Sequence, residues 1–115
     1  MTQPADLLDD VRSSALARLE VLDAEMAGLR LDRGSESADD EHDPEGATLS
    51  GEWSKLAGLR AATVAELADI DAARERLAEG TYGICADCGR RIPEGRLLAR
   101  PTATRCVACA EKAGG

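Results

Sequence analysis

Apolar side chains recur at helical spacing over roughly the first third of the chain. Their steps of three, four or seven residues place them along one face of a helix that we expect to span about residues 5 to 33. Pro4 suits the first turn of this helix, and Gly34 suits its C-terminal end. The stripe comprises Leu8, Ala15, Leu19, Leu22, Met26 and Leu29, and is widened by Val11 and Leu16.

A second amphipathic helix is predicted to begin near Pro44. Asp43 suits the N-cap, Pro44 the first helical position, and Glu45 the positive end of the helix dipole. The stripe comprises Leu49, Trp53, Leu56, Thr63, Leu67, Ile70 and Leu77, and Glu79-Gly80 closes the helix. Arg60 and Arg74 fall on the same face, which makes this stripe imperfect. A displaced stripe would use Leu59, Val64 or Ala73.

The two stripes predict a fold that is mainly α. Neither helix can bury its apolar face alone, so two long helices joined by about ten polar residues should fold back on each other. We expect an antiparallel coiled-coil helical hairpin over residues 1–79, with its tip at residues 36–47, and a small module over residues 80–115. Half of an intermolecular bundle would bury the same stripes, so the oligomeric state stays open.

Composition limits the function classes. The chain has 115 residues, formal net charge −8, one Trp, one Tyr and no Phe, which argues against a thick globular core. No apolar run approaches the roughly 20 residues of a membrane span, so we expect no membrane partner. An acidic chain is repelled by the phosphate backbone, which argues against nucleic-acid binding as the main activity.

All four cysteines fall in two Cys-x-x-Cys pairs, Cys85 with Cys88 and Cys106 with Cys109. This spacing lets two tight turns present four thiolates to one tetrahedral Zn²⁺. Gly89 follows the first pair where such a turn often needs a positive φ. Four sulfurs leave no open coordination position, so we predict one structural zinc ion and no metal-activated water.

Three other uses of the cysteines compete with zinc: disulfides, a thioredoxin-like redox pair, and ordinary buried thiols. The amino terminus lacks the basic start and apolar core of a secretory signal, which indicates a cytoplasmic, reducing location. No strand-helix-strand pattern surrounds Cys85, and unrelated thiols would not pair so regularly. No catalytic constellation of Ser-His-Asp, Cys-His or a phosphate-binding loop is evident, so we expect no enzyme; only a second metal at the acidic tip would change that.

The module between and after the cysteine pairs has few apolar residues. Two short extended segments, 91–95 and 96–99, are predicted to form a β-hairpin around a glycine turn. A final short helix would then carry Cys106 and Cys109. Metal binding should supply most of the folding free energy of this module, which is of order 10 kcal/mol in small zinc peptides.

The predicted tip of the hairpin is strongly acidic. Such a run of charge is usually a solvated connector. At the end of a stiff arm, however, it is well placed to be delivered into a partner. The six carboxylates are Glu36, Asp39, Asp40, Glu41, Asp43 and Glu45, with no Lys or Arg among them.

The module also resembles a known family. The shared residues are Gly80-Thr-Tyr-Gly-Ile-Cys85, Cys88-Gly89, Ile92, Arg96-Leu97, Ala99-Arg100-Pro101, Ala103, Cys106 and Cys109. This pattern closely resembles the four-cysteine zinc finger of the DksA/TraR family of bacterial RNA polymerase-binding regulators, and the acidic-tipped hairpin is similar to that family's architecture. The resemblance implies a transcription regulator that enters the secondary channel of RNA polymerase and alters initiation without binding DNA.

The resemblance also implies roles for single residues. Asp43, Glu45 and Ala47 would be the tip residues near the polymerase active centre. In the gapless register the first acidic position of the family's tip motif falls on His42, with Asp43 beside it; a shifted register uses Asp40 and Asp43 but puts Glu45 in the Ala place. On the finger, the basic side chains are candidate polymerase contacts or plain solvated charges. These are Arg90, Arg91, Arg96 and Arg100.

Longer members of the family carry extra N-terminal helices and a long C-terminal helix. This chain begins almost directly at the predicted hairpin and ends six residues after Cys109. Some members respond to the alarmone ppGpp through such regions, so a response to ppGpp stays open here, as do the target promoters and the choice between activation and repression.

A different class of function is also compatible with the sequence. The module would then be a zinc ribbon that binds nucleic acid or another protein, with the coiled coil as a dimeriser. Six basic against three acidic residues after residue 79 favour this reading, which predicts an affinity for DNA or RNA that falls steeply with salt.

Overall fold

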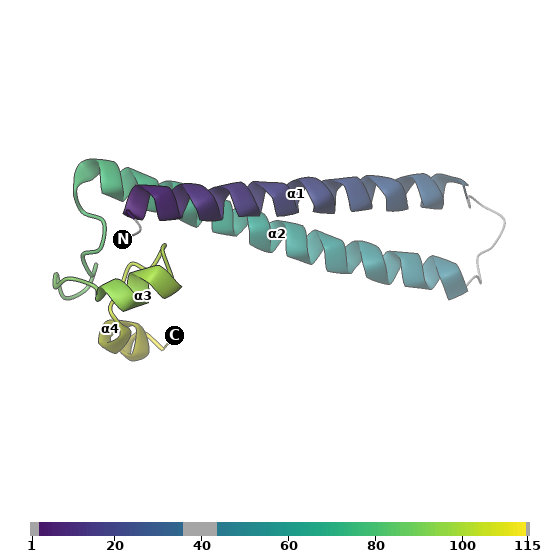
Figure 1. Cartoon of the computed structure of the whole chain (residues 1–115). Coiled ribbons are helices and arrows are strands. Elements are labelled where there is room, and N and C mark those ends of the chain that lie inside the picture. Colours follow the sequence, from purple (N-terminus) through teal and green to yellow (C-terminus); the bar gives the residue numbers. More distant parts are fainter. Residues whose placement is uncertain (1–2, 36–43, 115) are drawn as a thin grey trace. The chain divides into compact units, whose positions relative to one another are not determined.

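The computed structural model describes residues 3–35 and 44–114, and the burial of side chains within 3–31 and 50–114. Four helices follow one another in this part of the chain (Figure 1): α1 (Pro4–Ser35), α2 (Pro44–Glu79), α3 (Glu94–Ala99) and α4 (Val107–Lys112). The predicted mainly helical fold class is confirmed. None of these helices combines the length and hydropathy needed to cross a membrane.

The chain divides into two compact units. One comprises Met1–Ser13 with Leu67–Gly115, and the other Ser14–Glu66. We call them the finger unit and the hairpin unit, since the first contains the cysteines and the described residues of the second belong to α1 and α2. The predicted domain boundary between residues 79 and 80 stays a prediction.

Both long helices lie within two residues of the predicted bounds, but Gly34 lies inside α1 and does not end it. α1 begins at Pro4 and continues to Ser35, one residue past Gly34. α2 begins at Pro44 and ends at Glu79. Gly80 then takes a φ of +82°, its N–H donates to the Leu77 carbonyl at 3.3 Å, and the Thr81 N–H donates to the Arg76 carbonyl at 2.8 Å. This pair of bonds is the Schellman motif, which needs a left-handed residue at the position of the glycine.

Within the hairpin unit the two helices run antiparallel. Arg18 pairs with Glu66, and farther along α1 Asp23 pairs with Arg60. Partner numbers on α2 fall as those on α1 rise, as expected for a hairpin. The core is thin: Ala15, Leu29 and Thr63 are the buried residues within 14–31 and 50–66, where burial is described. Thr63 satisfies its hydroxyl by donating to the carbonyl of the residue one helical turn earlier, at 2.9 Å.

The finger unit contains the other ends of the two helices, again antiparallel. Asp9 contacts Arg74, and Arg12 contacts Asp71, so a step of three forward on α1 matches three backward on α2. The buried side chains at this contact are Leu8, Ile70 and Ala73.

Some predicted stripe positions differ from the structure. Leu16 is 39 % exposed, and the displaced stripe is not used at Leu59 or Val64, which are 47 % and 43 % exposed, whereas Ala73 is buried. The physical reason is that a pair of helices encloses only one narrow seam, so positions one step off the seam stay in contact with water.

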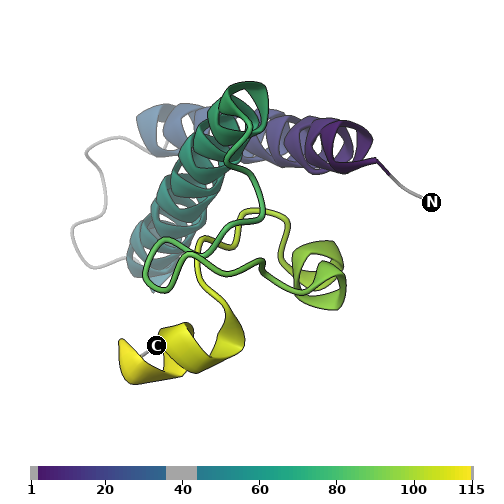
Figure 2. The same cartoon turned by 90° about the vertical axis from the view of Figure 1, so that its left-hand side faces the viewer.

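The segment between the two cysteine pairs is partly helical, so the predicted β-hairpin around Gly95 is wrong. Residues 94–99 form α3, with Pro93 at its N-cap and Glu94 in its first turn, and the Pro93 carbonyl accepts from the N–H of Arg96 at 3.0 Å. Strand pairing is limited, in the described chain, to one antiparallel bridge between Ile84 and Arg91. The predicted last helix is confirmed as α4, and Figure 2 shows α3 and α4 as separate short helices joined by irregular segments.

Candidate metal centre

The first cysteine pair lies on a tight turn held by its own backbone. The Cys85 N–H donates to the Arg90 carbonyl at 2.8 Å, and the Gly89 N–H donates to the Cys85 carbonyl at 3.0 Å. Gly89 has a φ of +74°, which confirms the positive φ predicted from the sequence. The turn closes because glycine enters this region without a steric cost.

The second pair lies at the start of α4. Cys106 is the N-cap residue, in an extended conformation, and Cys109 lies in the first turn of the helix. The Ala110 N–H donates to the Cys106 carbonyl at 2.9 Å. An N-cap followed by one helical turn therefore brings both sulfurs of this pair to the same side.

Contacts between the two pairs hold them at a fixed separation. The Ala86 N–H donates to the Thr104 carbonyl at 2.8 Å, and Arg105 Nε lies 2.8 Å from Asp87 Oδ2. Arg96 Nε donates to the Arg105 carbonyl at 2.7 Å. The cysteine turns are thus positioned by bonds that do not involve sulfur.

The four sulfurs converge on one point. All lie within 4.8 Å of one another, and the Cys88 and Cys106 Sγ atoms are 3.9 Å apart. Tetrahedral zinc with Zn–S bonds of about 2.3 Å requires sulfurs about 3.8 Å apart, whereas a disulfide requires about 2.0 Å. The cysteines are free thiols. Their chemistry and spacing fit one structural zinc ion, and the predicted cofactor is confirmed.

The environment favours a thiolate at one of these sulfurs. Backbone N–H groups of Cys88 and Cys106 lower the pKa of the Cys85 thiol to about 6. The protonated Cys109 thiol donates to the neighbouring sulfurs, chiefly Cys106 and then Cys85, and these hydrogen bonds raise the pKa of Cys109 to about 12. Since zinc binds thiolates, the proton held at Cys109 must leave when the metal enters.

The four predicted arginine contacts fall into two groups. Arg96 is half-buried, and its guanidinium is used to hold the second cysteine pair. Arg90, Arg91 and Arg100 are exposed, and their side chains make no hydrogen bond or ion pair with any residue that the structure describes. Of the four, only these three guanidiniums are therefore free for a partner; their role in binding stays a prediction.

The predicted tip residues lie at or beyond the limits of the described chain. Asp43, like His42, is outside the described residues. Glu45 and Ala47 belong to the first turn of α2, and only their backbone is described. Their function stays a prediction.

Two features that constrain the finger, a hydrogen bond and a glycine, were not foreseen from the sequence. Tyr82 Oη donates to the Pro101 carbonyl at 2.8 Å, and burial raises the pKa of this phenol. Gly83 has a φ of +81°, and a Cβ added there would lie 3.3 Å from Leu97 Cδ1. The sequence signal for the first was the solitary tyrosine, because a buried tyrosine hydroxyl usually finds an acceptor. The second depends on α3 and had no signal.

Comparison with known proteins shows what the finger is similar to. Residues 80–113 match the family model of the prokaryotic dksA/traR C4-type zinc finger. An uncharacterized protein of Aquifex aeolicus is 47 % identical over 57 residues, which are 50 % of this chain and 39 % of that protein. The RNA polymerase-binding transcription factor DksA of Caulobacter vibrioides is 44 % identical over 46 residues, 40 % of this chain and 32 % of that protein. The chain thus matches less than half the length of these two relatives.

A solved structure extends the likeness beyond the finger. Transcription factor DksA2 from Pseudomonas aeruginosa is 32 % identical, with a TM-score of 0.61, over 94 % of this chain and 83 % of that one. The similarity therefore covers α1 and α2 as well as the cysteines. With the zinc-finger motif complete and the likeness spanning most of both chains, this protein belongs to the DksA/TraR family, as the sequence resemblance predicted.

Proposed function

We propose that this protein is a non-enzymatic, cytoplasmic transcription regulator that binds RNA polymerase through its secondary channel and alters initiation without binding DNA. The observation that carries the proposal is the likeness to transcription factor DksA2 over 94 % of the chain. The name of the Caulobacter relative, an RNA polymerase-binding transcription factor, supports the choice of partner.

The hairpin unit has properties that suit insertion into a narrow channel. It is two antiparallel helices thick, and two packed helices are about 20 Å across. The exposed ion pairs Arg18–Glu66 and Asp23–Arg60 link its two helices along their length. In the proposal, Asp43 and Glu45 are delivered near the active centre, where carboxylates can compete for basic side chains or disturb bound magnesium.

The finger unit would act as the holder outside the channel. Arg90, Arg91 and Arg100 are its free cations among the predicted contacts and would face acidic polymerase surface, where such contacts raise the association rate and set orientation. The Arg96 guanidinium already holds the second cysteine pair, so we assign it no partner contact. Replacing Arg96 would impair binding only through the finger's own structure.

The test is a pull-down of core RNA polymerase with the zinc-loaded chain, combined with a transcription assay. The variant Asp43→Asn/Glu45→Gln should bind polymerase as the wild type does but lose its transcriptional effect. A matched control, Glu20→Gln/Glu25→Gln, removes two exposed charges from α1 and should keep both properties. Failure of the wild type to bind polymerase would remove the proposal.

The rival zinc-ribbon function makes an opposite prediction in a salt titration. If the finger bound DNA through several phosphates, retention on DNA would fall steeply as salt rises. With a net charge of −8, we expect weak retention with little dependence on salt. Strong, steeply salt-dependent retention would favour the nucleic-acid-binding module.

A further inference from the structure

Two arginines interrupt the seam of α2, whose other members are apolar apart from Thr63. Their positions fit the heptad spacing of that seam, three and four residues alternately, and they are two heptads apart. On α1, Asp9 and Asp23 are also two heptads apart. The α2 seam positions are Trp53, Leu56, Arg60, Thr63, Leu67, Ile70, Arg74 and Leu77.

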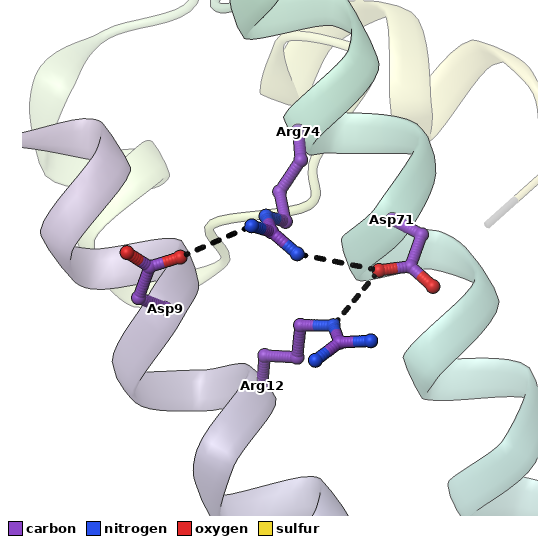
Figure 3. Close-up of polar contacts among 4 residues, drawn as sticks. All are labelled: Asp9, Arg12, Asp71 and Arg74. Atoms are coloured by element: carbon purple, nitrogen blue, oxygen red, sulfur yellow. Dashed lines mark hydrogen bonds and ion pairs between the residues drawn. The ribbon is translucent and has the colours of Figure 1, made fainter.

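In the finger unit the seam arginine joins a row of alternating charges (Figure 3). Arg74 lies between Asp9 of α1 at 3.7 Å and Asp71 of its own helix at 3.9 Å, and Arg12 of α1 reaches the same Asp71 oxygen at 3.0 Å. The Arg74 side chain is 46 % exposed. Its aliphatic stem can cover the seam while its guanidinium stays in water.

The hairpin unit repeats the arrangement. Arg60 Nε lies 2.6 Å from Asp23 Oδ1, and the Arg60 side chain is 44 % exposed. One heptad farther toward the start of α2, the Trp53 ring lies under the Arg30 guanidinium of α1, at 5.4 Å from ring centroid to Cζ. Trp53, Arg60 and Arg74 therefore each meet a chemically matching residue of α1. The steps between neighbouring members, seven and fourteen residues, are the same on both helices.

Displacement of one helix by one heptad would remove this match. Arg60 would then lie level with Leu16 or with Arg30 instead of Asp23, and Arg74 would lose Asp9. An arginine that loses its carboxylate partner loses that attraction, and two facing guanidiniums repel. An uninterrupted leucine seam would lack this discrimination, because leucine packs similarly against any apolar neighbour.

We propose that Arg60 and Arg74, with Asp23 and Asp9, form a register key that holds the hairpin in one alignment and keeps it two-stranded. Exposed ion pairs add little absolute stability, so their effect lies in the difference between the native and displaced alignments. The key also disfavours a bundle of two hairpins, since burying the seam from both sides would desolvate the guanidiniums. The inference concerns the hairpin alone and does not depend on the proposed polymerase partner.

The single tryptophan provides the assay. Trp53 is the only tryptophan in the chain, so the ¹⁵N-labelled, zinc-loaded full chain should give one indole N–H signal in a ¹H–¹⁵N NMR spectrum. In Arg60→Leu/Arg74→Leu we expect more than one indole signal, or self-association at least roughly tenfold tighter than that of the wild type in sedimentation. One indole signal with unchanged sedimentation in this variant would overturn the proposal, as would a wild type that is itself oligomeric.

Two further variants separate the key from added hydrophobicity and from misfolding. Ala61→Leu/Ala68→Leu places two leucines at exposed positions of α2 and should keep one indole signal and the wild-type mass. Equal heterogeneity in this control would contradict the key. If the double leucine variant does not fold, the charge exchange decides: Arg60→Asp alone should broaden or multiply the signal, and Asp23→Arg/Arg60→Asp should restore a single one. Failure of the exchange to restore it would overturn the proposal.

Discussion

Among the described glycines of the finger, Gly83 is the one where both the backbone conformation and a neighbouring atom oppose a side chain. Its φ of +81° lies in the left-handed region, and an added Cβ would meet Leu97 Cδ1 of α3 at 3.3 Å. Its carbonyl also accepts the Ile92 N–H at 2.7 Å, so the backbone there cannot rotate without losing that bond. We predict that Gly83→Ala weakens the finger through both the backbone conformation and the contact.

The magnitude follows from the two terms. A left-handed conformation costs a residue with a Cβ about 1–2 kcal/mol. Leu97 is half-buried and its terminal methyl can move by a few tenths of an ångström, so the contact adds at most about 1 kcal/mol. Because finger folding is coupled to metal binding, the sum of about 1–3 kcal/mol should appear as a loss of zinc affinity of roughly five- to 150-fold.

Competition for zinc against a chelator of known affinity, in reducing buffer, measures this loss. Gly89→Ala is the matched control, because Gly89 has a φ of +74° but open space around an added Cβ. It should lose only the conformational part, roughly five- to thirtyfold. Gly95→Ala, within α3 and also in open space, should not weaken zinc binding. Unchanged affinity in Gly83→Ala, or a larger loss in Gly89→Ala, would refute the reasoning.

Four other predictions test separate contacts. Zinc removal should melt α3 and α4, with six residues each against 32 in α1 and 36 in α2, and lower the helical ellipticity by at least about 15 %; a loss above half would show that the hairpin depends on the metal. Tyr82→Phe should cost about 0.5–1.5 kcal/mol of unfolding free energy, seen as a lower melting temperature, because the bond to Pro101 is lost; an unchanged melting temperature would contradict that bond. Zinc affinity should fall from about pH 8 to about pH 6, because the proton that Cys109 holds in the free site competes with the metal; a flat profile would count against it. Thr63→Val should be neutral or stabilise by up to about 1 kcal/mol in urea unfolding, since it removes a buried hydroxyl with its bond; a large loss would assign that hydroxyl a further role.

The helices were predictable because their signals are long and local. Leu8, Ala15 and Leu29 repeat over several turns and are all buried. Pro44 and Gly80 mark helix ends through their own backbone preferences. The width of the seam was not predictable, since it depends on how many helices pack together. Leu16 would be covered in a larger bundle but is exposed in a pair.

The finger, too, was only partly predictable from the sequence. Cysteine spacing predicted the metal, because the ligand geometry of zinc allows few arrangements of two short turns. A helix of six residues, as in α3, has too few turns to show periodicity. Pro93-Glu94-Gly95 repeats the residue types of Pro44-Glu45-Gly46, where α2 begins, but only the latter is followed by a long apolar stripe at helical spacing. The bond from Arg96 to the Arg105 carbonyl depends on the folded positions of both segments, and no local pattern encodes it.

Zinc has a structural consequence beyond the four sulfurs, because the finger shares apolar surface with the helix ends of its own unit. Leu7 of α1, Leu77 of α2, and Ile92 and Leu97 of the finger line one cavity of about 610 Å³. A chain without zinc should therefore lose order at these helix ends, while the seam of the hairpin unit keeps its own contacts. In the proposed regulator, loss of zinc and substitution of the tip residues should therefore have different effects on polymerase binding. Zinc removal should reduce polymerase binding through the holder, whereas Asp43→Asn/Glu45→Gln should spare binding and remove the transcriptional response. If both changes had the same effect on binding, the division of labour between the finger and the tip would have to be abandoned.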